Sequence, residues 1–288
     1  METKRLGATE VMLPAIGLGF WRYRGGPEPL LRGVEVGAFL LDTAEIYGTE
    51  ELVGAAIHDC RDRVFVATKV AGNHLRFDDV LRAAEGSLKR LATGVIDLYQ
   101  IHWPNPAVPI GETMRAMETL VDRRLVRYIG VSQFSTAELH AARAAMNHYS
   151  IVANQVRYSL NARRIEMGLL DYCEQNQVTI IAYTPLDDGR LASLPAGRNR
   201  RMQVLTAIAA QTRKTLGQVA LNWCIAHPSV IAIPKSNSVS RTVENCLASG
   251  WRLTPSQIKQ LDTAFSWRGE RIRARLGEFR RRVRSRLS

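Results

Sequence analysis

Eight short apolar segments recur along this chain, with amphipathic stretches of helical spacing between them. The segments are residues 15–19, 38–42, 63–69, 95–102, 127–132, 150–155, 178–184 and 230–235. Segment 178–184 is apolar on both faces, as expected of a parallel strand covered by helices on one side and by a barrel interior on the other. Eight such units in about 250 residues predict an α/β protein with a (β/α)8 barrel fold.

The barrel carries predicted additions. Residues 3–17 contain a Gly-Ala-Thr-Glu turn between two short alternating runs, which indicates a hairpin before the first barrel strand. Residues 216–226 have the pattern of an extra helix before the last strand. We expect one domain over residues 1–265, followed by an arginine-rich tail at 266–288.

A doubly wound open sheet is the structural alternative. Such sheets usually carry a G-x-G-x-x-G fingerprint after the first strand, and residues 17–26 lack that spacing. A Walker-type phosphate loop is also absent from the sequence. Any phosphate site would therefore be of another kind, such as the one that barrels often place near their seventh and eighth strands.

The net charge of +12 is concentrated at the C-terminus. Nine arginines follow residue 267 against two glutamates, so the remaining chain carries only +5. A tail that binds nucleic acid or another anionic surface is one interpretation, but such clusters are more often solvated termini. We expect no specific nucleic-acid partner.

Cysteine spacing and hydropathy exclude several other classes. Cys60, Cys173, Cys224 and Cys246 lie far apart, which indicates buried thiols rather than a metal site or a disulfide framework. No stretch approaches the roughly 18 apolar residues of a membrane span. The first residues also lack the apolar run of a secretion signal, so a cytoplasmic location is expected.

Polar residues gather at the predicted carboxyl ends of the strands, where barrels of this kind carry their chemistry. Asp42, Lys69 and His102 end three successive segments, and Tyr47 follows five residues after Asp42. Each residue alone has an ordinary structural explanation, such as a turn cap or a surface charge. Their joint occurrence points to a catalytic set.

The chemistry of this set is that of a tyrosine acid. A phenol with a pKa near ~10 is a poor proton donor and acceptor at neutral pH, and a neighbouring Lys69 would lower that pKa. Asp42 would hold the lysine, and His102 would hydrogen-bond a substrate oxygen. Such a set suits protonation of a carbonyl oxygen, and a bound hydride donor would complete the reaction.

These residues resemble the aldo-keto reductase family over residues 3–264. The most specific motif is LDTAEIYGTEELVG at residues 41–54, which is similar to the family segment with the catalytic aspartate and tyrosine. Lys69 in ATK and His102 in IHWP match the other two members of the catalytic tetrad. Three further segments, NQVRYS, AYTPL and IPKSNSVSRTVEN, resemble family cofactor segments.

The resemblance implies an NADPH-dependent enzyme that reduces aldehydes or ketones to alcohols, without a metal. Tyr47 would be the general acid, Lys69 its pKa modifier, Asp42 the partner of the lysine and His102 the residue that orients the carbonyl. Trp21 and Trp103, with Tyr47 and His102, would contact a small-molecule carbonyl substrate. The implied cofactor residues are Ser132, Gln155, Tyr183, Pro185, Leu186, Lys235, Ser236, Arg241, Glu244 and Asn245.

The sequence departs from the family pattern in places. Gln133 follows Ser132 where asparagine is common, and Asp187 and Asp188 stand where glycine is common. A second hypothesis is a cofactor-bound regulatory or interaction subunit with little turnover, although the intact tetrad argues against it. The family members that reduce carbon–carbon double bonds carry glutamate at the position of His102, which disfavours that activity.

Overall fold

The computed structural model describes residues 1–193 and 199–266. The arginine-rich tail predicted at 266–288 therefore lies outside the described residues, apart from Ser266. No helix within the described ranges is long and apolar enough to cross a membrane.

The described chain forms an eight-stranded parallel sheet in which each strand pairs with the next along the sequence. Gly17 N donates to Ala232 O and Ala232 N donates to Ala15 O, which joins the first edge of the sheet to the last. The predicted barrel is thus confirmed, and each apolar segment supplies one strand. The strands are β3 Leu18–Gly19, β4 Leu40–Asp42, β5 Phe65–Val70, β6 Ile96–Ile101, β7 Val126–Ser132, β8 Ile151–Arg157, β9 Thr179–Tyr183 and β10 Val230–Ala232.

An antiparallel hairpin precedes the barrel, as predicted, and comprises β1 (Thr3–Arg5) and β2 (Met12–Pro14). Leu6 and Leu13 from this hairpin belong to the same buried cluster as the side chains of the barrel interior. Lys4 Nζ donates to three main-chain carbonyls near the start of β10, at 2.6–2.7 Å. Burial lowers the pKa of Lys4 to about 8. The hairpin therefore packs against the end of the barrel at which the strands begin.

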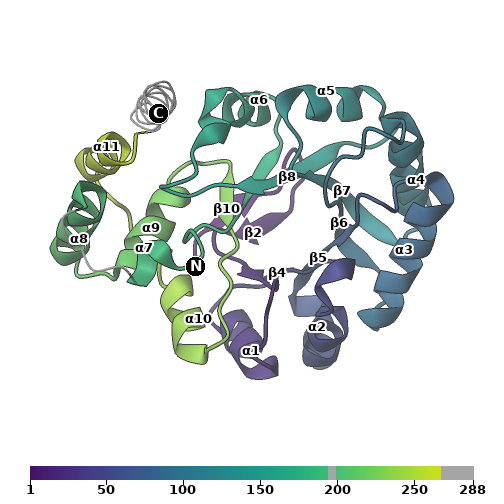
Figure 1. Ribbon diagram of the computed structural model, residues 1–288. Helices are drawn as coiled ribbons and strands as arrows, with labels where there is room; N and C mark the ends of the chain where they lie inside the picture. Colours follow the sequence, from purple (N-terminus) through teal and green to yellow (C-terminus); the bar gives the residue numbers. More distant parts are fainter. Residues whose placement is uncertain (194–198, 267–288) are drawn as a thin grey trace, which may run out of the picture.

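Helices surround the sheet on the outside (Figure 1). Capping boxes begin α5 (Thr136–Ala144), α9 (Leu216–Cys224) and α11 (Pro255–Ala264). Ser135, Thr215 and Thr254 each accept a hydrogen bond from the third residue of the helix that follows. The extra helix predicted at 216–226 is α9, and it ends at Cys224. The helices are α1 Pro27–Glu35, α2 Glu50–Ile57, α3 Phe77–Arg90, α4 Ile110–Asp122, α5 Thr136–Ala144, α6 Leu169–Gln175, α7 Arg190–Ser193, α8 Arg200–Thr212, α9 Leu216–Cys224, α10 Val239–Cys246 and α11 Pro255–Ala264, with 3-10 helices at Glu45–Tyr47, His58–Arg63 and Arg164–Met167.

The four cysteines are free and buried, as expected from their spacing. Burial raises the pKa of the Cys173, Cys224 and Cys246 thiols to about 12. They therefore stay protonated at neutral pH and behave as small apolar residues of the core.

Candidate active site

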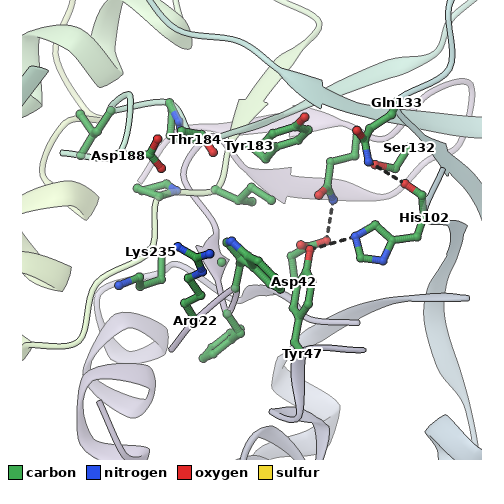
Figure 2. A pocket seen from close by; sticks show the side chains of 18 of the residues that line it. Arg22, Asp42, Tyr47, His102, Ser132, Gln133, Tyr183, Thr184, Asp188 and Lys235 are labelled. Carbon is green, nitrogen blue, oxygen red and sulfur yellow. Dashed lines mark hydrogen bonds between the residues drawn. The ribbon is translucent and has the colours of Figure 1, made fainter. Parts of the chain in front are cut away.

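A pocket of about 600 Å³ opens at the carboxyl ends of the strands. Its walls come from residues far apart in the sequence, which the barrel brings to one rim (Figure 2). The lining includes Asp42, Tyr47, His102, Ser132, Gln155, Tyr183, Pro185, Leu186 and Lys235, all predicted from the sequence.

The four predicted tetrad residues lie together at one side of this pocket. Tyr47 Oη lies 3.2 Å from His102 Nε2, within hydrogen-bonding distance. Lys69 Nζ lies 5.0 Å from the centre of the Tyr47 ring and donates to Asp42 Oδ1 at 2.6 Å. Tyr47 ends the 3-10 helix Glu45–Tyr47, which stops at Gly48, where φ is +66°. This turn brings the phenol over Lys69 on the next strand.

Asp42 accepts hydrogen bonds on both carboxylate oxygens. Lys69 uses Oδ1, whereas Gln155 Nε2 donates to Oδ2 at 2.7 Å and Gln100 Nε2 donates to the same oxygen at 3.3 Å. Lys69 also donates to the carbonyl of Thr43 at 2.7 Å. A buried charge pair requires such partners, because each charge has lost its hydration.

The protonation states follow from burial and from this ion pair. Burial alone would lower the pKa of Lys69, but Asp42 and Tyr47 outweigh it and raise that pKa, so the lysine is charged. Burial and, to a smaller extent, the positive charge of Lys69 together lower the pKa of His102 to about 3. The imidazole is therefore neutral at pH 7.

The expected net lowering of the Tyr47 pKa is wrong for this structure. Burial raises the pKa of Tyr47 above its ordinary value, and Lys69 opposes this rise without cancelling it. Tyr47 is consequently a protonated phenol at pH 7. Loss of hydration weighs more than one neighbouring charge, and the sequence alone could not reveal that balance.

Both predicted substrate tryptophans line the pocket. The Trp21 ring centre lies 4.9 Å from that of Tyr47, and the Trp103 ring centre lies 4.8 Å from that of His102. Trp21 is 49% exposed, so its ring presents an open apolar face at the mouth. Ile46 adds a second exposed apolar side chain to the same wall.

Four predicted cofactor residues do not line the pocket. Ser236 lies in the loop after β10, and Arg241, Glu244 and Asn245 lie on α10. Arg241 Nη1 contacts Glu244 Oε2 at 3.0 Å, while the arginine side chain remains 59% exposed. Lys235 lines the pocket but lies three residues beyond the end of β10 rather than at a strand end.

The structure adds pocket residues that the sequence prediction omitted. Gln133, flagged only as a departure, has φ of +63° and donates from Nε2 to the carbonyl of His102 at 3.1 Å. The guanidinium carbon of Arg22 lies 5.3 Å from the Trp21 ring centre. Arg22 and Asp188 both line the pocket (Figure 2). Arg22 directly follows Trp21 and Asp188 lies two residues after Leu186, and this proximity in the sequence was the available signal.

Asp187 takes a different position from its neighbour. Its carboxylate accepts from Arg157 Nη2 at 2.7 Å and from Asn161 Nδ2 at 3.1 Å. Asp187, Asp188 and Gly189 all have positive φ, at +50°, +54° and +83°. Asp187 is thus hydrogen-bonded to Arg157 at the end of β8, whereas Asp188 lines the pocket.

Known proteins share this architecture and sequence. The family model described as "Aldo/keto reductase family" matches residues 15–265. Methylglyoxal reductase YeaE of Escherichia coli is 34% identical, with 89% of this chain and 92% of that protein covered.

Two solved structures extend the comparison. An aldo/keto reductase of Klebsiella pneumoniae in complex with NADP and acetate has 36% identity and a TM-score of 0.82, with 91% and 95% of the two chains covered. A thermostable aldo-keto reductase in complex with the inhibitor epalrestat has 40% identity and a TM-score of 0.85, with 92% and 100% covered. The chain belongs to the aldo/keto reductase family.

Proposed function

We propose that this enzyme uses NADPH to reduce small aldehydes and ketones, 2-oxoaldehydes among them, to alcohols, with Tyr47 as the proton donor. The proposal rests chiefly on one observation. Tyr47 Oη and His102 Nε2 meet at 3.2 Å at the pocket wall, beside the buried Lys69–Asp42 pair. Two neutral hydrogen-bonding groups beside a fixed ammonium suit a carbonyl oxygen on which negative charge develops.

The pocket fits the nicotinamide end of the cofactor. Asp42 can only accept hydrogen bonds, so it fixes Gln155 with Nε2 turned inward and leaves Oε1 as an acceptor for an amide N–H. Ser132 supplies a hydroxyl and Tyr183 a ring face at the same wall. Gln155 and Ser132 would therefore hold the carboxamide, and Tyr183 would stack on the ring.

The opposite end of the pocket suits phosphate groups. Lys235 and Arg22 bring two cationic side chains to that end (Figure 2). Pro185 and Leu186 add main-chain and apolar contacts from the loop after β9. Ser236 and Arg241 would contact the adenosine phosphate, with Glu244 and Asn245 at the adenine.

When bound, NADPH would supply the hydride that the carbonyl carbon accepts. Neutral His102 orients the carbonyl oxygen toward Tyr47 by hydrogen bonding through Nε2. Tyr47 holds the proton at Oη and delivers it to that oxygen. Lys69 stabilises the phenolate left behind, and Asp42 keeps the lysine charged.

Small substrates agree with the dimensions of the site. Much of a 600 Å³ pocket would be taken by the nicotinamide, and Trp21 and Trp103 narrow what remains. The related protein from Escherichia coli is named a methylglyoxal reductase. A two- or three-carbon dicarbonyl compound is therefore the first substrate class to examine.

The test is NADPH oxidation by the purified protein with methylglyoxal, glyoxal, benzaldehydes, simple ketones and keto-sugars. We expect turnover with the small aldehydes and the appearance of the matching alcohol. Omission of the carbonyl compound controls for oxidation of NADPH by itself. A protein that binds NADPH yet reduces none of these compounds would contradict the proposal.

A further inference from the structure

Gly72 contacts the indole of Trp103, and the contact leaves no room for a larger residue. A Cβ built on Gly72 would lie within 2.6 Å of three indole atoms, Nε1, Cδ1 and Cε2, a separation that folded proteins essentially never show. The φ of Gly72 lies outside the left-handed region, so the backbone conformation alone does not demand glycine. Glycine is required at this position because the Trp103 indole occupies the space that a Cβ would need.

The main chain at Gly72 is held from several sides. Glu45 accepts from Ala71 N, and His74 N donates to Ala71 O at 2.9 Å. Asn105 Nδ2 donates to Gly72 O at 2.8 Å, which ties the loop after Trp103 to the same glycine. These hydrogen bonds hold the main chain of Gly72 in place. A side chain added at Gly72 would therefore displace the indole rather than the main chain.

A side chain added at Gly72 would displace the Trp103 indole, which forms part of the pocket wall. Trp103 lines the pocket, whereas Gly72, which its indole contacts, is not among the lining residues. A shifted indole would reshape the pocket wall beside His102, whose ring centre is 4.8 Å from that of Trp103. The substituent on the substrate carbonyl would lie against this part of the wall.

We infer that Gly72 determines substrate size in this enzyme by setting the position of the Trp103 indole; this inference rests on the proposed carbonyl reduction. Gly72 is thus a positioning residue that acts through Trp103. With glycine at this position, the site still admits a single aromatic ring on the carbonyl carbon, and a larger residue restricts the enzyme to the smallest aldehydes.

The test compares Gly72→Ala with the wild type on methylglyoxal and on a substituted benzaldehyde. We expect kcat/KM for the benzaldehyde to fall at least about tenfold more than that for methylglyoxal, as overpacking at a fixed wall implies. NADPH affinity should stay within about twofold, because neither Gly72 nor Trp103 is a predicted cofactor residue. Gly111→Ala is the matched control, because its added Cβ meets nothing within 4 Å and both activities should be retained.

A double-mutant cycle separates this effect from damage to the fold. In a Trp103→Ala background the indole is gone, so Gly72→Ala should change the ratio of the two activities by less than about twofold. Equal losses on both substrates, or the same selectivity change without the indole, would overturn the inference. If the wild type reduces no carbonyl compound, the proposed function fails instead, and a crystal structure of Gly72→Ala with an undisplaced indole would then overturn this inference separately.

Discussion

Gln155 Nε2 donates to Asp42 Oδ2 at 2.7 Å, on the carboxylate oxygen that Lys69 does not use. The two residues are 113 positions apart in the sequence and are joined across the interior of the barrel mouth. The bond connects a residue of the pocket wall to the buried ion pair beside Tyr47. The position proposed to hold the nicotinamide carboxamide is thereby linked to the proposed acid.

This link predicts two separable effects of replacing Gln155. Gln155→Leu should weaken NADPH binding about fivefold, the usual worth of one hydrogen bond, and should destabilise the fold by about 1–3 kcal/mol because Asp42 loses a buried donor. The matched control is Gln100→Leu, which removes a 3.3 Å bond to the same oxygen and a 3.4 Å bond accepted from Gln155 Nε2, at a residue that does not line the pocket. Fluorescence titration and urea unfolding of both variants measure the two effects; equal loss of NADPH affinity in both would contradict the assignment.

Much of this arrangement could be predicted from the sequence. Each apolar segment became a strand, and strand order in a closed parallel barrel follows chain order, so Asp42, Lys69 and His102 had to meet at one rim. Helices α7 and α8 were not predicted. The run from Arg200 to Thr212 mixes charged and small residues, and its packing against α9 and α11 stabilises it as a helix.

The side-chain contacts made across the barrel could not be predicted from the sequence. The bond from Gln155 to Asp42, the donation from Gln133 to the His102 carbonyl and the contact between Gly72 and Trp103 depend on side-chain geometry rather than on spacing. The direction of the Tyr47 pKa shift depended on the depth of burial. Residue type alone carries neither kind of information.

The low pKa of His102, about 3, predicts how stability depends on pH. A histidine in the unfolded chain has a pKa of about 6.5. Between about pH 6.5 and 3, His102 is therefore protonated in the unfolded chain and neutral in the folded chain. Stability is therefore lost as the pH falls through this window, by up to about 1.4 kcal/mol per pH unit from this residue. Denaturant unfolding at pH 5.5 and 7 should show a smaller loss for His102→Gln than for the wild type; identical losses would contradict a neutral buried imidazole.

Cofactor preference provides another prediction. Arg241 is 59% exposed and is paired only with the nearby Glu244 among the contacts described for its side chain, so it can turn to a phosphate. Arg241→Ala should weaken NADPH binding about tenfold or more and leave NADH within about twofold, because only NADPH carries the additional phosphate. Arg82→Ala, from the comparable Arg82–Asp79 pair on α3, should change neither affinity. A wild type that binds NADPH and NADH equally would refute the prediction.

The arginine-rich tail, outside the described residues, should be separable from catalysis. Every proposed site residue lies between Trp21 and Asn245, so deletion of residues 277–288 should leave NADPH affinity and small-aldehyde turnover within about twofold. The deletion removes a net charge of +4. Any DNA binding by the full chain should be weak and steeply salt-dependent, and should vanish on truncation. Loss of aldehyde reduction in the truncated protein would show that the tail is required.

The Tyr47→Phe variant tests the central claim most directly, with Tyr183→Phe as a control in the same pocket. Single-turnover reduction of methylglyoxal by NADPH should slow by roughly 100-fold or more when the Tyr47 hydroxyl is absent, while NADPH affinity and the unfolding midpoint remain close to the wild type. Tyr183→Phe keeps the ring and should stay within a few-fold of the wild-type rate. A Tyr47→Phe protein that reduces methylglyoxal at the wild-type rate would show that Tyr47 is not the proton donor.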